Sequence, residues 1–188
     1  MRFEWPTSGS GTVTAAQIGS GKPWVTVHAR AARPLMAPQY AGFDLKKEIV
    51  AIDRKRKERW SKGDVVEVRL TAGAPTMWTW VVIDDPVPAG ATILGSGFGR
   101  ESNLATGGVT GERHGGWWGE PIHTERAFDA FRAYYEYFHS TAQYPVKLSY
   151  RIRLNNAGEF VLPPTRVEAM YAPENFGEVP NAPWSVAE

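Results

Sequence analysis

The sequence of 188 residues contains no cysteine, which excludes three kinds of chemistry at once. Without thiols the chain can form neither disulfides nor thiolate zinc sites, and it has no cysteine nucleophile. An excess of one charge is also missing, because 21 basic and 20 acidic residues leave a formal net charge of +1. The molecule as a whole therefore lacks the field that would recruit nucleic acid or anionic lipid.

Long apolar runs are missing as well. No stretch approaches the roughly 18 residues of a membrane-spanning helix, and the start "MRFEWPTSGSG" lacks the apolar core of a signal peptide. Two interpretations remain: a cytosolic protein, or a chain whose Met1 stands inside a longer precursor. What is present is 43% apolar residues and eight tryptophans, enough for one large domain with a core that needs no disulfides.

Strand patterns separated by turn signals fill most of the chain. In residues 64–73, apolar Val66, Val68 and Leu70 alternate with the other side chains, as in a half-buried strand. Residues 125–139 fit both a helical stripe and strand alternation, and the β-propensity of their aromatic side chains favours a strand. Further strands are expected at residues 43–53, 76–84, 146–153 and 165–171, with a short return strand before Pro163. The pattern predicts an all-β sandwich of about seven strands.

The beginning of the chain predicts two short strands, Thr12–Gln17 and Trp24–Ala29, separated by the turn "GSGKP". Two strands cannot form a core alone. We therefore expect them to complete a sheet whose other strands lie elsewhere, so that the chain begins in the middle of a domain.

Motifs for metal or phosphate chemistry are weak. The four histidines, His28, His114, His123 and His139, are too scattered to predict a metal site. The glycines of residues 95–99 lack the spacing of a phosphate-binding loop, and no G-x-S-x-G elbow occurs. No metal and no cofactor is expected. The charged run "DRKRKER", residues 53–59, is typical of a solvated turn at a strand edge.

Carboxylates and tryptophans leave two alternatives open. A hydrolase would need Asp85 or Glu168 beside a second carboxylate in a cleft. Asp84 and Asp85 are adjacent, which places their side chains on opposite faces of a strand, and the proline after them favours a capped turn. A stand-alone carbohydrate- or protein-binding module would instead use its loop tryptophans, and for a sugar Trp60, Trp117 and Trp118 would form a stacking platform. Because no nucleophile, base and oxyanion site come together, we expect no enzyme.

Four stretches carry a resemblance to a known family. They are "YRIRLNNAGEFVLPPTRVEAMYAPENFGE", "WVVIDDPVPAGATIL", "RFEWP" and "AARPL". Together they resemble the C-terminal region of bacterial alpha-2-macroglobulins, large relatives of the thioester-containing protease inhibitors. The resemblance implies that residues 1–32 are the returning strands of a split CUB-like domain. It implies that residues 33–188 are the last macroglobulin-like (MG10) β-sandwich, comparable to the receptor-binding domain of the eukaryotic relatives.

The same resemblance implies a role for the pair Met170–Tyr171. In this family the final domain packs on the thioester domain, and a Met-Tyr pair at this position shields the thioester until a bait region is cleaved. Pro163, Pro164 and Pro173 would position the strand that presents the pair. Strand alternation would place Met170 and Tyr171 on opposite faces, so both can contact one partner only at a bulge or strand end.

The resemblance also implies where the domain works and with what. The thioester itself needs a Cys-x-Glu-Gln motif, which this cysteine-free chain does not carry. The implied partners are the thioester domain and the other macroglobulin domains of one full-length chain, together with the proteases that the chain traps. The implied location is the periplasm, in a parent lipoprotein of the inner membrane, with no membrane or nucleic-acid contact by this fragment.

Overall fold

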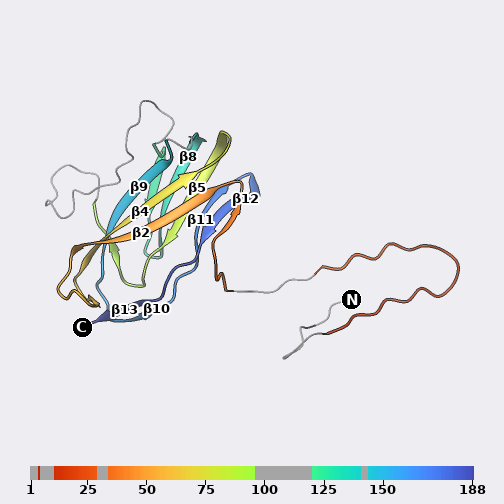
Figure 1. Ribbon diagram of the computed structural model, residues 1–188, viewed down its shortest axis with the longest axis horizontal. Coiled ribbons are helices and arrows are strands. Elements are labelled where there is room, and N and C mark those ends of the chain that lie inside the picture. Colours follow the sequence, from red (N-terminus) through yellow and green to blue (C-terminus); the bar gives the residue numbers. More distant parts are fainter. Residues whose placement is uncertain (1–3, 5–10, 29–33, 96–119, 141–143) are drawn as a thin grey trace. The chain divides into compact units, whose positions relative to one another are not determined.

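The computed structural model describes residues 4, 11–28, 34–95, 120–140 and 144–188 (Figure 1). The chain divides into two compact units, Met1–Pro34 and Leu35–Glu188. In the first unit, residues 11–28 are exposed and contain no strand. The strands expected at Thr12–Gln17 and Trp24–Ala29, which would complete a sheet whose other strands lie elsewhere, therefore stay a prediction. Trp24 is 98% exposed. Two extended segments without further strands to pair with cannot bury such side chains.

The second unit is built from strands. Their bounds are β1 Gln39–Ala41, β2 Asp44–Asp53, β3 Trp60–Ser61, β4 Val65–Gly73, β5 Trp78–Pro86, β6 Thr92–Ile93, β7 His123–Arg126, β8 Ala130–Phe138, β9 Val146–Arg153, β10 Gly158–Phe160, β11 Thr165–Ala169, β12 Ala172–Val179 and β13 Trp184–Ala187. Within the described ranges there is no helix that could cross a membrane.

Two antiparallel sheets pack face to face around one core. The larger sheet has the order β1-β12-β11-β5-β8-β7, and the smaller has the order β2-β4-β9-β6. Figure 1 shows β2, β4 and β9 side by side in one layer, with β5, β8 and β11 in the other. A third sheet, β10-β13-β3, includes the one parallel pair among the described strands. The predicted β-sandwich is confirmed.

The strands outnumber the expected seven for two reasons. Most of the additional ones, such as β3 and β6, are two to four residues long, too short to show alternation in the sequence. The long strand β12 follows directly on the Met-Tyr pair, but Pro173 and Gly177 within it are residues that weaken a strand prediction. The return strand before Pro163 is β10, which pairs with β13 rather than with its neighbour β9.

The ambiguous segment 125–139 contains a strand, as its aromatic side chains predict. In β8, Phe131, Ala133 and Tyr135 are buried at alternate positions. The helical alternative would have buried Phe128, which is 88% exposed. The ring of Phe131 stacks on that of Tyr150 from the opposite sheet at a centroid distance of 4.2 Å. This pair joins the two layers at the centre of the core.

Strand β4 differs from its predicted pattern at one face. Val66, Val68 and Leu70 are buried as expected, but Glu67 on the other face is also nearly buried. Its carboxylate accepts hydrogen bonds from Arg69 Nε at 2.7 Å and from Arg151 Nε at 3.1 Å. Burial alone would raise the pKa of Glu67, but the two guanidinium groups together outweigh burial and lower that pKa below its ordinary value.

Acid is therefore expected to weaken the fold through Glu67. A carboxyl with a lowered pKa contributes stability above its unfolded pKa, about 4.3, and loses it as the pH falls through the folded pKa. Between pH 6 and pH 3 the urea midpoint should fall less for Glu67→Gln than for the unaltered chain. The exposed Glu159 supplies the control, since Glu159→Gln should keep the full acid sensitivity. Equal acid sensitivity in all three chains would contradict this assignment.

Candidate functional site

Met170 and Tyr171 form the turn that joins β11 to β12. The residues on either side, Ala169 and Ala172, pair with each other, so the two intervening side chains stand at the tip of a hairpin. Met170 is 43% exposed and Tyr171 is 81% exposed. The pair thus lies at a strand end, which is the arrangement that allows both side chains to contact one partner.

The hairpin is irregular directly below its tip. Glu168 pairs with Phe176, whereas the next residue, Ala169, pairs with Ala172, so residues 173–175 lie outside the ladder with β11. Pro173 has no N–H to donate, which suits this unpaired stretch. The side chain of Asn175 donates to the carbonyl oxygen of Ala172 at 3.3 Å and helps to close the bulge.

A residue from a neighbouring strand anchors the turn. The backbone N–H of Met170 donates to the carbonyl oxygen of Trp80 in β5 at 2.8 Å. The indole of Trp80 also meets the ring of Tyr171 edge to face, with centroids 6.5 Å apart and planes at 85°. Trp80 is 41% exposed. We call Trp80, Met170 and Tyr171 the sheet-end cluster. The sequence gives no sign that Trp80 belongs to it.

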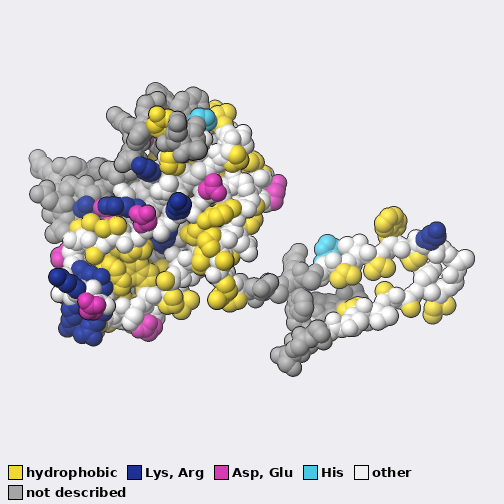
Figure 2. Space-filling model, viewed as in Figure 1, with side chains coloured by type: hydrophobic (Ala, Val, Ile, Leu, Met, Phe, Trp, Pro, Cys, Tyr) yellow, Lys and Arg dark blue, Asp and Glu magenta, His cyan; other side chains and the backbone are white. Residues whose placement is uncertain are grey.

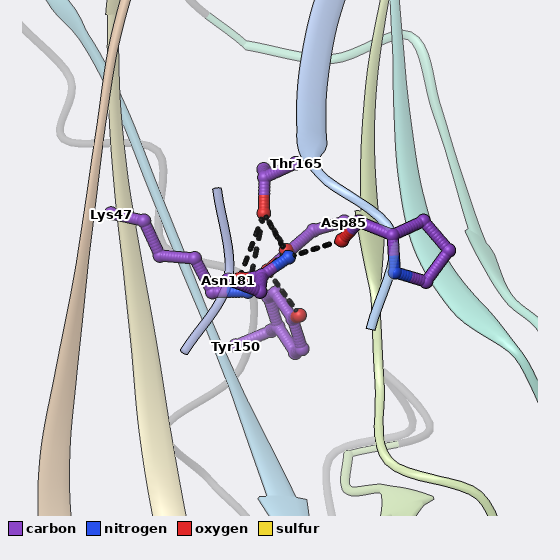
Figure 3. Close-up of polar contacts among 6 residues, drawn as sticks. Lys47, Asp85, Tyr150, Thr165 and Asn181 are labelled. Atoms are coloured by element: carbon purple, nitrogen blue, oxygen red, sulfur yellow. Dashed lines mark hydrogen bonds and ion pairs between the residues drawn. The ribbon is translucent and has the colours of Figure 1, made fainter. Parts of the chain in front are cut away.

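The other end of β11 is fixed by a buried polar network between the sheets (Figure 3). At its centre the carboxylate of Asp85 in β5 is fully buried. Its Oδ1 accepts hydrogen bonds from Lys47 Nζ in β2 and from Thr165 Oγ1 in β11, both at 2.5 Å. Its Oδ2 accepts one from the hydroxyl of Tyr150 in β9 at 2.6 Å. Burial, followed by the charge of Asp85, raises the pKa of Tyr150 well above its ordinary value.

The ammonium of Lys47 has a complete set of partners. Besides Asp85 it donates to Thr165 Oγ1 at 3.2 Å and to Asn181 Oδ1 at 2.8 Å. Asn181 in turn donates through Nδ2 to the carbonyl oxygen of Pro163 at 2.6 Å. Three donors with three acceptors satisfy a buried lysine. The network therefore joins strands of both sheets and fixes the position of the chain immediately before β11.

This network corrects the interpretation of the acidic pair. Asp84 and Asp85 were expected in a capped turn, but both lie within β5. Their side chains do point to opposite faces: Asp85 into the core, and Asp84 outward, where its Oδ2 accepts from Arg132 Nε at 3.0 Å. The turn prediction failed because the strand continues through Asp85 to Pro86.

Outside the core, Arg166 in β11 holds the hairpin together. Its guanidinium bonds to Glu168 at 2.5 Å and to Glu178 of β12, and its Nη2 donates to the carbonyl oxygen of Pro173 at 3.0 Å. Burial would lower the pKa of Arg166, but the two carboxylates outweigh burial and raise it. Glu168, one candidate acid of the hydrolase alternative, is therefore occupied in an ion pair. The three prolines predicted to position the strand lie beside it: Pro163 and Pro164 directly before β11, and Pro173 in the bulge.

The remaining sequence candidates do not assemble a site. His114, Trp117 and Trp118 lie outside the described residues. Trp60 does not offer an open stacking face, because Arg54 lies 4.1 Å over its ring and Trp184 packs 5.5 Å away. The described part of the chain holds no group of three side chains able to bind a metal. The run 53–59 is an exposed turn after β2, as predicted, and Figure 2 shows the gathered lysines and arginines there.

Comparison with known proteins shows the family to which this chain is similar. Residues 42–174 match the family described as "Bacterial Alpha-2-macroglobulin MG10 domain". A native alpha-2-macroglobulin from Escherichia coli, solved by cryo-EM, is 25% identical with a TM-score of 0.62 over 84% of this chain and 10% of that one. The comparison with curated proteins finds no match.

Two further structures share the fold. A crystal structure of the Escherichia coli protein, spanning domain MG7 to the C-terminus, is 24% identical with a TM-score of 0.61, over 82% of this chain and 25% of that one. A Salmonella alpha-2-macroglobulin reacted with methylamine is 21% identical with a TM-score of 0.61, over 80% and 10% respectively. The chain thus spans between a tenth and a quarter of the length of these relatives.

Proposed function

Because the chain belongs to the bacterial alpha-2-macroglobulin MG10 domain family, we propose that it acts as the last macroglobulin-like domain of a protease-trapping protein. In this proposal the sheet-end cluster packs on the thioester domain of the same full-length chain. Met170 and Tyr171 keep water and small amines away from the thioester until the bait region is cut. The domain itself catalyses nothing, and it binds no cofactor.

The observation that supports this proposal best is the exposure of a Met-Tyr pair at the tip of a hairpin that is anchored by hydrogen bonds at both ends of β11. A turn that projects a flexible thioether and a large ring, 43% and 81% exposed, leaves apolar surface that a neighbouring domain could cover. The thioether adapts to an irregular surface, and the ring covers a large area. Excluding water from an acyl thioester protects it from hydrolysis. The network at one end of β11 and the bonds of Arg166 reduce the movement of the hairpin.

A protease trap of this kind requires that the contact between this domain and the thioester domain differ before and after cleavage of the bait region. The domain would bind the thioester domain in the intact inhibitor and release it after cleavage, when the exposed thioester reacts with a lysine of the protease. A change of state follows only where the contact free energy differs between the two states. A small and mainly apolar patch, rather than an interface of many ion pairs, suits a contact that must open.

The first unit supports a second part of the proposal. Its described residues 11–28 are extended and exposed, and they include Ile18 at 97% and Trp24 at 98% exposure. We propose that residues 1–32 complete a CUB-like domain whose other strands come from an earlier part of the full-length chain. Added strands would bury these side chains and pair their backbone groups. The proposed location, by family, is the periplasm, in a lipoprotein parent of the inner membrane.

The proposal predicts faster loss of the thioester when the turn is truncated. In the full-length protein, Tyr171→Ala and Met170→Ala should each raise the rate of methylamine-induced thiol release about tenfold, which corresponds to roughly 1.4 kcal/mol of lost protection. Free thiol, titrated over time before any protease is added, gives this rate.

Phe128→Ala is the matched control, because Phe128 is also an exposed aromatic residue but precedes β8 at the opposite end of the sheet. It should leave the rate unchanged. Rates for Tyr171→Ala and Met170→Ala equal to that of the unaltered protein would contradict the shielding role. The carbohydrate-binding alternative would gain support only if oligosaccharides quenched the tryptophan fluorescence of this chain.

A further inference from the structure

Trp80 has an unusual backbone. Its φ angle is 55°, and no other non-glycine residue in the described ranges has a positive φ. A left-handed conformation is strained for a bulky side chain, whereas glycine or asparagine adopts it readily. Such strain persists where the surrounding structure enforces it, and it is concentrated at functional sites. The question is therefore what a tryptophan contributes here that an unstrained residue would not.

The strain lies where two strands, β5 and β8, interrupt the regular alternation of inward and outward side chains. Val81 of β5 and its partner Tyr135 of β8 point into the core. The next inward pair is Trp78 with Phe138, three residues away rather than two, and Trp78 packs on the core residue Phe43 at 5.6 Å between ring centroids. The pairing register is the same on both sides of the change. In both strands, therefore, the set of residues that points into the core shifts by one position at the level of Trp80.

Because of this interruption, the indole of Trp80 does not follow the regular inward and outward alternation of β5. Irregularities of this kind redirect a side chain. Trp80 then makes both contacts described above: its carbonyl oxygen accepts from the N–H of Met170 at 2.8 Å, and its ring meets that of Tyr171 edge to face. One strained residue thus contacts both residues of the turn.

Burial does not explain the choice of tryptophan. The side chain remains 41% exposed, so this domain buries only part of its ring. Glycine would remove the strain, and the carbonyl oxygen would remain to accept from Met170. What only an aromatic residue supplies is a ring against which Tyr171 can rest.

We propose that Trp80 is a positioning residue for Tyr171, and that the left-handed backbone at Trp80 aims the indole so that the three side chains present one apolar contact surface. The proposal rests on the shielding function proposed above for Met170 and Tyr171, and it extends that surface to a third residue. The partner is the apolar face of the domain that holds the thioester. In the free domain, Trp80 limits the range of orientations of the Tyr171 ring, so less order has to be gained on docking.

The test uses two substitutions with opposite properties. Trp80→Asn accepts the left-handed backbone but removes the ring, and Trp80→Phe keeps an aromatic edge together with the strain. In the 188-residue chain, Trp80→Asn should leave the melting temperature unchanged or raise it. It should shift the ¹⁹F resonance of 3-fluorotyrosine at position 171, because ring currents from the indole are lost. Trp80→Phe should shift this resonance less.

In the full-length protein, Trp80→Asn should raise the rate of methylamine-induced thiol release severalfold, and Trp80→Phe should restore most of the protection. The double variant Trp80→Asn/Tyr171→Ala should react more slowly than the product of the two single effects predicts, since Trp80 acts in part by positioning Tyr171. That non-additivity separates positioning from a general loss of stability.

Three results would overturn the proposal. An unchanged ¹⁹F resonance in Trp80→Asn would show that Trp80 does not hold Tyr171, whatever the function of the turn. A large fall in melting temperature for Trp80→Asn would make Trp80 a residue of the fold. If Tyr171→Ala accelerates thiol release and Trp80→Asn does not, the positioning role is wrong while the shielding function stands. If neither Tyr171→Ala nor Trp80→Asn accelerates thiol release, the shielding function is wrong. The ¹⁹F resonance then still tests whether Trp80 positions the ring of Tyr171.

Discussion

A chain carrying Asp85→Asn is expected to be destabilised by about 3–5 kcal/mol, a large part of the stability of an ordinary domain. The substitution hardly changes the shape of the side chain, but it removes the negative charge that faces Lys47. The side chain of Lys47 is only 9% exposed, so water cannot replace the lost partner. A buried ammonium without a counter-charge is the costly species.

Urea unfolding of the 188-residue chain measures this effect, and the midpoint should fall by about 2 M for a typical dependence on denaturant. The neighbouring Asp84→Asn is the matched control. Its carboxylate lies on the outer face, is 43% exposed and pairs with Arg132, so its removal should cost less than about 1 kcal/mol.

A second substitution separates the lost charge from lost packing. Lys47→Met combined with Asp85→Asn removes the unpaired ammonium and should recover most of the stability. If Asp85→Asn were no more harmful than Asp84→Asn, the network would not be the element that fixes β11. If the double variant were as unstable as Asp85→Asn alone, the cost would come from packing and not from the charge.

Gly177→Ala is expected to destabilise the chain by about 1–3 kcal/mol by a different mechanism. A Cβ at this position of β12 would stand 2.6 Å from the carbonyl oxygen of Phe43 and 3.2 Å from a methyl group of Val167. Phe43 is a core residue with 1% exposure, so its backbone cannot move away without disturbing the core. Strand β12 would have to shift outward instead, and it carries one side of the hairpin.

Thermal unfolding followed by circular dichroism measures this effect, and the melting temperature should fall by about 5 °C. Gly73→Ala provides the control within the same fold, because a Cβ there would have its nearest neighbours at 3.8 Å, an ordinary contact distance. Similar melting temperatures for Gly177→Ala and Gly73→Ala would show that the close approach of β12 to Phe43 is not a constraint.

The regular parts of this fold could be predicted because their signals are local. Alternation in β4, the aromatic run of β8 and the prolines around β11 each follow from side chains within one segment. The position of Met170 and Tyr171 at a strand end could also be expected, since Pro163–Pro164 and Pro173 limit the strand on both sides. What these residues do together was proposed from family resemblance, because a hairpin tip has no chemistry of its own.

The rest depends on contacts between distant segments. Asp85 looks like a turn residue in sequence, and only the fold brings Lys47, Tyr150 and Thr165 to it from three other strands. The left-handed backbone of Trp80 is equally hidden, because a tryptophan in a β-rich run gives no local sign of positive φ. Both features bear on β11, the first near its beginning and the second at its end.

The most direct test of the central claim is a photo-crosslink from position 171 in the full-length protein. With p-benzoylphenylalanine in place of Tyr171, irradiation of the native protein should attach the probe to the peptide around the Cys-x-Glu-Gln motif. The same crosslink should be lost after protease treatment, when the domain has moved away. A probe that attaches to another domain, or that gives the same crosslink before and after bait cleavage, would contradict the account.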